Sequence, residues 1–290
     1  MVCWQSLVSA KWLHNALRQP DRLSNLRVLD STGAISNAKE NYLKKHIPGA
    51  LYFDVEECID KASKYPNMLP SPKEFEQYVG DLGISNKTHI VVYDTTDYYG
   101  FFSAQRAWWM FKVFGHDMVS VLDGGFKLWC DHGFETTDKI DKVSRQSFKA
   151  KFHPEYVKSF EDIIGNQCTK EFQVLDARST GRFHGNDPEP RDDTKSGHMK
   201  GSISVPFKEI IDPNTKRLKT PEELKALFTS AGVDMNKPMV TSCGSGITAC
   251  CLAFAASVCG KEDVAVFDGS WTEFYLRSKP EHRVCPTDKQ

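Results

Sequence analysis

The chain has 290 residues, of which 40% are hydrophobic and 26% charged, a composition that supports about two domains with packed cores. Its formal net charge of -1 argues against a general binder of nucleic acids or acidic membranes, which would be more basic. The longest apolar stretch, Ala249 to Val258, is far shorter than the roughly 20 residues of a membrane-spanning helix. We therefore expect a globular protein without a membrane span.

The N-terminal segment lacks the continuous apolar core of a secretory signal. It carries Lys11 and Arg18 but no acidic residue before Asp21, which faintly resembles a mitochondrial presequence. We favour an ordinary first helix, whose inner side would carry Leu7, Trp12, Leu13 and Leu17. The expected location is cytoplasmic, with the mitochondrion as the alternative.

The sequence contains nine cysteines, an odd number, so at least one of them cannot pair within the chain. No two of them have the C-x-x-C spacing, which argues against a structural zinc site. Free thiols fit a reducing compartment best. We expect no metal site.

The two halves of the chain repeat the same short motifs in the same order. Conserved spacing accompanies the order, since the matching aspartates and histidines recur 145 to 152 residues later. A duplicated domain explains both observations. The motifs of the first half, each followed by its counterpart, are RVLDSTG and QVLDARS, KHIPGALYF and GHMKGSISVPF, HIVVYD and PMVTSC, and VSVLDGGFKLW and VAVFDGSWTEF.

Within each half, short β-branched runs such as residues 119–122 alternate with helical patterns such as residues 103–114. Strands that alternate with helices predict an α/β fold with a mostly parallel sheet flanked by helices. We predict domains over residues 1–138 and 158–290. The polar, lysine-rich stretch 139–157 would link them.

One cysteine stands where such sheets place their ligands, beyond the carboxyl end of a strand. Residues 238–242 predict a short strand that ends at Cys243, and a buried helix closing at Gly260 follows. Glycines in the connecting loop permit a tight turn, and the helix start adds partial positive charge. Both favour a thiolate. We expect Thr248 to cap the helix and Ser245 to donate a hydrogen bond into the loop.

The alternative for Cys243 is a buried structural cysteine, which is how we interpret Cys250, Cys251 and Cys259. A phosphatase would need an arginine six residues after the nucleophile, where this chain has Ala249. Sulfur transfer through a persulfide fits the loop better. The equivalent strand of the first half ends at Asp94, so we expect that half to be inactive.

The loop CGSGITAC resembles the active loop of the 3-mercaptopyruvate sulfurtransferases, a two-domain family of the rhodanese superfamily, except that Ile247 stands where valine is usual. The resemblance covers nearly the whole chain and implies two tandem rhodanese-like domains, the first inactive and the second catalytic. Thiosulfate-specific rhodaneses have charged residues where this chain has Gly244 and Ser245. A basic rim suits dianionic thiosulfate, whereas mercaptopyruvate is a monoanion.

The resemblance also implies the site residues, with Cys243 and Ser245 as the catalytic pair. The segment GRFHGNDPEPRD is similar to the family segment that supplies two substrate-binding arginines. Without the resemblance, these arginines would be surface residues paired with Glu189 or Asp192. The implied substrate-binding residues are Arg182, Arg191, Gly244, Gly246, Ile247 and Thr248.

The segments KHIPGA and GHMKGSISVP are similar to a structural motif of the superfamily. His46 and His198 are therefore expected to pack and to hydrogen-bond rather than to act as bases. Asp30 and Asp176 are expected to hold neighbouring backbone at strand ends.

One segment departs from the family pattern. Relatives are proposed to link the loop serine to a histidine and an aspartate, and these positions fall on Asn67 and Glu56 here. The usual relay cannot form from these residues. Either it is unnecessary, or the protein is slower or prefers another donor.

Taken together, the sequence predicts a sulfurtransferase that moves sulfur from 3-mercaptopyruvate to a Cys243 persulfide and releases pyruvate. The expected acceptor is thioredoxin, a small thiol or cyanide. We expect no metal or organic cofactor, no nucleic-acid or membrane partner, and a monomer or weak dimer. The alternatives are a thiosulfate sulfurtransferase and a weakly active sulfur-sensing or interaction protein.

Overall fold

The computed structural model describes residues 5–19 and 25–289. Contacts between Cα atoms divide the chain into two compact units. The first unit contains residues up to Lys61 together with Leu69–His153 and Asp212–Leu218, and the second contains Ala62–Met68, Pro154–Ile211 and the residues from Lys219 onward. The predicted boundaries at residues 138 and 158 describe a single cut, whereas the contact division assigns two short segments to the other half's unit.

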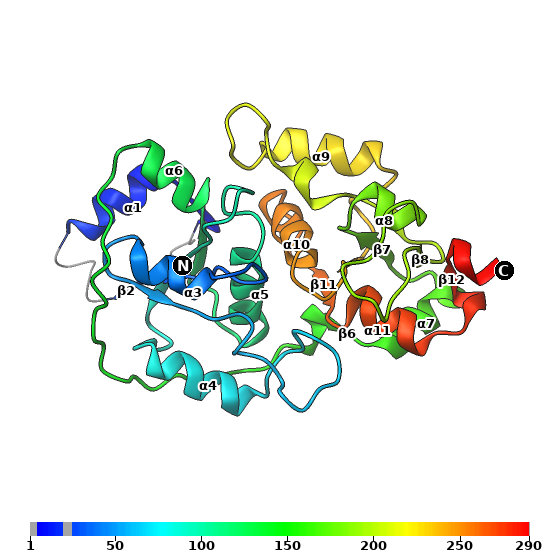
Figure 1. The fold of residues 1–290 in the computed structure, drawn as a ribbon, viewed down its shortest axis with the longest axis horizontal. Coiled ribbons are helices and arrows are strands. Elements are labelled where there is room, and N and C mark those ends of the chain that lie inside the picture. Colours follow the sequence, from blue (N-terminus) through cyan, green and yellow to red (C-terminus); the bar gives the residue numbers. More distant parts are fainter. Residues whose placement is uncertain (1–4, 20–24, 290) are drawn as a thin grey trace. The chain divides into compact units, whose positions relative to one another are not determined.

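The first unit is a five-stranded parallel sheet with helices on both faces (Figure 1). Helices α1 and α6 pack on one face with Val28, Val91 and Leu122, while α5 contacts β4 and β5 on the other. The strand order is β1-β5-β4-β2-β3. The elements are β1 (Leu7–Val8), α1 (Ala10–Leu17), β2 (Leu26–Asp30), α3 (Ala38–Lys44), β3 (Ala50–Tyr52), α4 (Pro72–Asp81), β4 (His89–Tyr93), α5 (Ala104–Val113), β5 (Val119–Leu122) and α6 (Gly125–Asp131).

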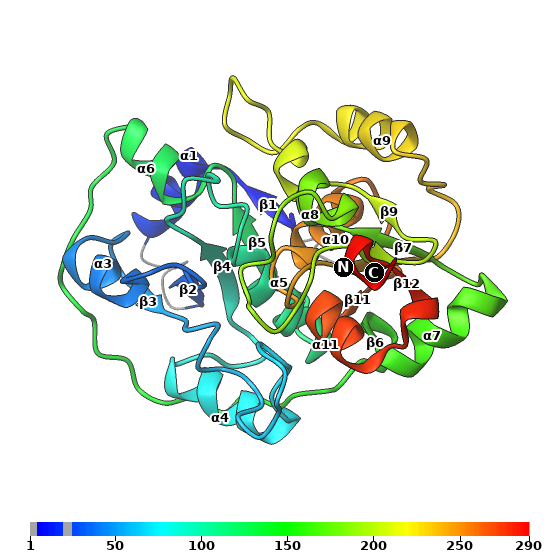
Figure 2. The ribbon, with the colours of Figure 1, turned by 45° about the vertical axis from the view of Figure 1, so that its right-hand side comes forward.

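The second unit has the same architecture (Figure 2), with strand order β6-β11-β10-β7-β9. Helices α7 and α11 pack on one face with Val240, Ala265 and Phe267, and α10 contacts β10 and β11. The elements are β6 (Val157–Lys158), α7 (Phe160–Thr169), β7 (Gln173–Asp176), α8 (Thr180–His184), β8 (His198–Met199), β9 (Ile203–Ser204), α9 (Pro221–Ser230), β10 (Met239–Ser242), α10 (Ala249–Val258), β11 (Val264–Phe267), α11 (Ser270–Arg277) and β12 (Arg283–Val284). Short 3-10 helices cover Pro154–Tyr156, Phe207–Ile210, Pro280–His282 and Pro286–Lys289.

The α/β class and the duplication are confirmed. In the first unit the N–H of Ser31 donates to the carbonyl of Tyr93 at 2.8 Å, and in the second the N–H of Ala177 donates to that of Ser242 at 2.8 Å. The repeat therefore extends from sequence motifs to individual hydrogen bonds. The antiparallel pair of β8 with β12 is the one pairing outside the two parallel sheets among the described strands, and the sequence did not predict it.

The favoured first helix is confirmed as α1. The hydroxyl of Ser9 accepts the N–H of Trp12 at 3.1 Å and so begins the helix, and Leu13 is fully buried. Leu7 was placed on this helix by the prediction but lies in β1, because it pairs with Val121 at the edge of the sheet. In the described part of the chain, none of the helices has the length and apolar character needed to cross a bilayer.

The two motif histidines make structural contacts, as expected. The ring of His46 contacts the carbonyl oxygens of Tyr42 at 2.7 Å and of Lys139 at 3.2 Å. The ring of His198 contacts the carbonyl oxygen of Phe183 at 2.8 Å and stacks on its phenyl ring. Each histidine thus fastens a loop to a neighbouring element.

Candidate active site

The Cys243 loop, residues Cys243–Thr248, connects the central strand β10 to helix α10. Strand β10 is fully buried between β7 and β11, so its carboxyl end is held on both sides. Gly246 has a φ of 81°, in the left-handed region that glycine adopts without cost, and this residue turns the chain into the helix. The predicted strand–cysteine–helix arrangement is confirmed.

The backbone on either side of the cysteine sulfur is fixed by the start of α11. The N–H of Cys243 donates to the hydroxyl of Ser270 at 3.1 Å, and its carbonyl accepts the N–H of Trp271 at 3.0 Å. The carbonyl of Gly244 accepts both the N–H and the hydroxyl of Thr272, at 3.0 and 2.8 Å. Four hydrogen bonds therefore orient the first two residues of the loop.

Several N–H groups of the Cys243 loop have no acceptor within residues 5–19 and 25–289. These are the N–H groups of Gly244, Ser245, Ile247 and Thr248. They precede the N-terminus of α10, where the helix dipole adds partial positive charge. Such a set of donors favours an anion at this place.

Two details of the loop differ from the sequence prediction. Thr248 occupies the N-cap position of α10, but its side chain makes no capping hydrogen bond, because its φ of -74° and ψ of -13° are already helical. Ser245 was expected to donate a hydrogen bond, and its hydroxyl instead accepts one, from the side-chain amide of Asn67 at 3.0 Å. The same amide donates to the carbonyl of Ser245 at 3.1 Å.

Asn67 therefore contacts the loop serine, as its position in the family pattern implied, whereas Glu56 does not. The carboxylate of Glu56 accepts the N–H of Ala34 at 3.0 Å, within the first unit. A neutral amide thus stands where the family has a titrating imidazole.

Access to the sulfur is restricted. Cys243 is 3% exposed, while Gly244 and Ser245 beside it are partly exposed. A donor must therefore approach past these two residues, which makes their small side chains part of the entrance.

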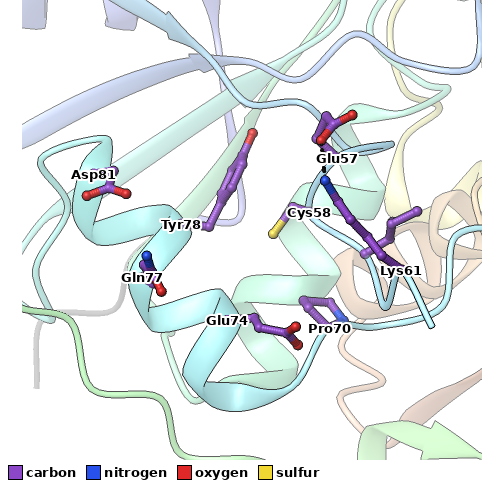
Figure 3. A pocket seen from close by; sticks show the side chains of 9 residues that line it. Glu57, Cys58, Lys61, Pro70, Glu74, Gln77, Tyr78 and Asp81 are labelled. Atoms are coloured by element: carbon purple, nitrogen blue, oxygen red, sulfur yellow. Dashed lines mark hydrogen bonds and ion pairs between the residues drawn. The ribbon is translucent and has the colours of Figure 1, made fainter. Parts of the chain in front are cut away.

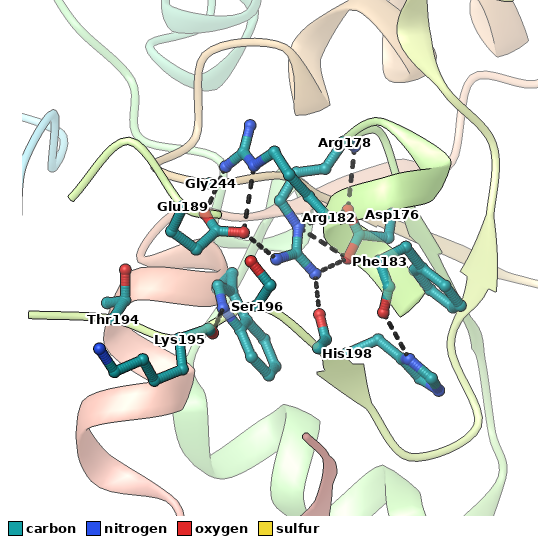
Figure 4. Close-up of polar contacts among 12 residues, drawn as sticks. Asp176, Arg178, Arg182, Phe183, Glu189, Thr194, Lys195, Ser196, His198 and Gly244 are labelled. Atoms are coloured by element: carbon teal, nitrogen blue, oxygen red, sulfur yellow. Dashed lines mark hydrogen bonds and ion pairs between the residues drawn. The ribbon is translucent and has the colours of Figure 1, made fainter. Parts of the chain in front are cut away.

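An arginine network lies against the loop (Figure 4). A Cβ added to Gly244 would lie 2.9 Å from the terminal nitrogen of Arg182, so the guanidinium packs on the loop backbone. Glu189 receives Arg182 through its Nε at 3.1 Å and the buried Arg178 at 2.8 Å. Arg178 in turn pairs with Asp176 at 2.5 Å. Two carboxylates face two guanidinium groups, so the network presents no uncompensated negative charge to the loop.

The alternative that Arg182 pairs with Glu189 and the prediction that it lies at the site thus both describe the same side chain. Arg191 differs, because its side chain is exposed and its described contacts run through its carbonyl, which accepts the N–H and hydroxyl of Thr194. The structure brings Arg182 to the Cys243 loop and does not bring Arg191 there.

The remaining cysteines differ from Cys243 in their surroundings. Cys58 lines a cavity of about 280 Å³ in the first unit, beside Tyr78, Glu74 and Lys61 (Figure 3). Burial raises the pKa of the Cys58 thiol to about 12, so this sulfur stays protonated near neutral pH. Within the described residues, no cluster of three or more side chains could hold a metal ion.

Sequence reasoning missed the residues that reach the site from other segments. Ser270, Trp271 and Thr272 come from the loop after the next strand, and the only signal for them was the DGSWT counterpart of the DGGFK motif. The bridging role of Glu189 between two arginines had been considered only as a surface pairing.

Comparison with known proteins agrees with this architecture. The rhodanese-like domain family matches residues 9–132 and 157–277. The chain is 44% identical to mouse 3-mercaptopyruvate sulfurtransferase over 285 residues, covering 97% of this chain and 95% of that protein. It is 45% identical to rat thiosulfate sulfurtransferase over 287 residues, covering 98% and 96%.

A solved structure shows the same similarity in three dimensions. The crystal structure of SseA from Escherichia coli, described as a 3-mercaptopyruvate sulfotransferase with the rhodanese fold, has a TM-score of 0.80 and 33% identity. The match covers 92% of this chain and 99% of SseA. Two matched domains, the curated relatives and this structure lead to one conclusion: the chain belongs to the rhodanese family and is a sulfurtransferase.

Proposed function

We propose that the protein transfers sulfur from 3-mercaptopyruvate through a persulfide on Cys243. The thiolate attacks the donor sulfur, the carbon–sulfur bond breaks, and its electron pair leaves with pyruvate enolate, which takes up a proton. The observation that carries the proposal is the set of loop N–H groups without an acceptor, which would stabilise the persulfide anion. Ser245 would donate its hydroxyl hydrogen to the reacting sulfur, since its oxygen already accepts from Asn67.

Arg182 is proposed to bind the donor's carboxylate and carbonyl. Its guanidinium lies against Gly244, and Glu189 holds two of its nitrogens, so the side chain is oriented before substrate arrives. Arg191, exposed nine residues further on, would add a second contact from the solvent side once substrate is bound. Gly246, Ile247 and Thr248 would contribute loop backbone.

The entrance favours a monoanionic donor. Gly244 and Ser245 add no charge beside Cys243, so a dianion such as thiosulfate would find Arg182 alone, already paired with Glu189. Thiosulfate remains the second candidate donor, because the chain is as similar to a thiosulfate sulfurtransferase as to a 3-mercaptopyruvate sulfurtransferase.

The proposed acceptor is thioredoxin or a small thiol, with cyanide as a substitute in the test tube. No organic cofactor or metal enters this reaction. We propose a monomer or weak dimer in the cytoplasm or mitochondrion. All eight cysteines of the described residues are free thiols, which supports a reducing compartment.

The test compares kcat/KM for the two donors on purified protein, with pyruvate and sulfite as the products measured. We expect at least about a tenfold preference for 3-mercaptopyruvate. Arg182→Ala should lower kcat/KM for 3-mercaptopyruvate by about 10- to 100-fold, while Arg145→Ala, an exposed arginine paired with Asp81, should leave it unchanged. A preference for thiosulfate would replace the first candidate with the second.

Mass spectrometry tests the intermediate directly. After treatment with donor, Cys243 should gain one sulfur atom, and the Cys243→Ser variant should gain none at that position. If neither donor adds sulfur to Cys243, the protein is a sensing or interaction protein rather than an active transferase.

A further inference from the structure

Ser270 adopts a backbone conformation that residues other than glycine rarely take. It is the first residue of α11, is fully buried, and has a φ of 51° in the left-handed region. A Cβ atom disfavours this region. A side chain kept there is typical of places where function outweighs local strain.

The first unit shows what the fold uses at this position when no nucleophile is present. Its counterpart is Gly125, with a φ of 54°. The correspondence is fixed by one hydrogen bond in each unit, from the N–H of Phe126 to the carbonyl of Asp94 at 3.1 Å, and from that of Trp271 to the carbonyl of Cys243 at 3.0 Å. A Cβ on Gly125 would lie 2.7 Å from the Asp94 carbonyl oxygen, so the first unit has no room for a side chain there.

In the second unit this position holds a hydroxyl beneath the cysteine. The oxygen of Ser270 accepts the N–H of Cys243 at 3.1 Å and lies 4.0 Å from its sulfur. Its hydrogen is donated to the carbonyl of Phe267 at 2.9 Å. The hydroxyl has one hydrogen and two acceptors within reach, the carbonyl and the sulfur.

The geometry points to Ser270 as a positioning residue that holds the backbone of Cys243 and stabilises its thiolate by turning the hydroxyl hydrogen from Phe267 toward the sulfur. Only the S–H bond breaks in this step, and its proton goes to solvent. The meaning of the step depends on the proposed function, because the thiolate is the nucleophile there. The step itself precedes any contact with a sulfur donor.

The test measures the rate at which iodoacetamide alkylates Cys243 as a function of pH, with the modified peptide quantified by mass spectrometry. Ser270→Ala removes the hydroxyl and keeps the Cβ, whereas Ser270→Gly removes both and restores the residue of the first unit. In both variants the midpoint of the rate profile should move up by about 0.5 to 1 pH unit, since a hydrogen bond to the charged form favours that form.

Two controls separate this role from a structural one. Ser257→Ala removes a hydroxyl that makes the same kind of bond, to the carbonyl of Phe254 at 2.7 Å near the end of α10, and should not move the midpoint. The exposed Cys168 is an internal reference whose own profile should stay unchanged in every variant.

The inference is overturned if folded Ser270→Gly protein, verified by its thermal melt, alkylates Cys243 with the wild-type midpoint. Because alkylation needs no sulfur donor, the result stands apart from the donor assays. Failure of sulfur transfer with a shifted midpoint would reject the proposed function alone, and an unshifted midpoint with intact transfer would reject the role of Ser270 alone.

Discussion

The loops after β4 and β10 occupy the same place in the two units and treat negative charge in opposite ways. In the first unit Asp94 supplies its own anion, and one carboxylate oxygen accepts the N–H groups of Phe102, Ser103 and Ala104 at 3.0 to 3.2 Å. In the second unit Cys243 takes that position, and its loop N–H groups have no acceptor among the described residues. One repeat has satisfied its helix N-terminus with a side chain, and the other leaves it available for sulfur.

The comparison explains why a duplicated fold would carry one site. The anion-binding character belongs to the architecture, because strand, loop and helix meet alike in both units. Chemistry depends on a single substitution at the strand end and on the loop length before the helix. Nine residues separate Asp94 from α5, whereas five separate Cys243 from α10.

The largest expected effect comes from making the second loop resemble the first. Cys243→Asp should abolish sulfur transfer, by more than about 1,000-fold in turnover, because a carboxylate cannot form a persulfide. The fold should persist, since the equivalent loop already holds an aspartate. Pyruvate release from 3-mercaptopyruvate measures the loss, and Cys168→Ala, at an exposed thiol on α7, is the control expected to retain full activity.

Retention of turnover by Cys243→Asp would show that another thiol carries the sulfur. The thermal melt of the variant must match the wild type for the comparison to hold. A large drop would mean that the shorter loop cannot accommodate the carboxylate.

Emptying the first loop should affect stability rather than chemistry. Asp94→Ala leaves three buried N–H groups of α5 without their acceptor, which should lower the free energy of unfolding by about 2 to 4 kcal/mol. Urea denaturation measures the change. Asp97→Ala, in the same loop but almost fully exposed and 3.5 Å from Lys127, should change stability by less than about 0.5 kcal/mol. Equal effects of the two variants would contradict the role assigned to Asp94.

How much of this could be predicted depends on whether the contacts are local in the sequence. The arrangement of β10, Cys243 and α10 is contiguous, so glycine placement and the apolar run were enough to predict it. The hydroxyl of Ser270 reaches the cysteine from 27 residues away, and only the fold brings it there. The pair β8 and β12 was missed because strands of two residues carry no periodicity.

Side-chain direction limited the prediction in the same way. Arg182 and Arg191 lie nine residues apart, and the sequence treated them alike. Helix α8 and Glu189 hold the first against the Cys243 loop, whereas the second is exposed. Spacing along an extended segment does not determine which residues turn inward.

The strand-end aspartates sharpen the comparison through their pH dependence. Burial raises the pKa of Asp30 to about 6, and no cation pairs with it among the described residues, whereas Asp176 pairs with Arg178. The ordinary value for Asp30 is 3.8, so the folded state holds its proton more tightly than the unfolded state does. Its stabilising contribution is complete below pH 3.8 and is lost as the pH rises through about 6.

Asp30→Asn should therefore flatten the fall in unfolding free energy between pH 4 and pH 7, by about 2 kcal/mol relative to the wild type. Urea denaturation at several pH values measures the difference. The asparagine oxygen can keep the contact with the Thr32 hydroxyl, so the fold should be retained. An unchanged pH profile would mean that Asp30 is ionised in the folded protein at a normal pH.

The smallest effect concerns the amide that replaces a titrating group beside the Cys243 loop. Asn67 has a φ of 59°, so Asn67→Gly removes its contacts with Ser245 without adding backbone strain. We expect kcat/KM for 3-mercaptopyruvate to fall by about 3- to 10-fold, because the serine hydroxyl loses its orientation. An amide does not titrate, so the fall should be equal at every pH from 6 to 9. A fall confined to one end of that range would show that Asn67 acts by tuning an ionisable neighbour, and the site would then depend on charge where the structure shows only an oriented dipole.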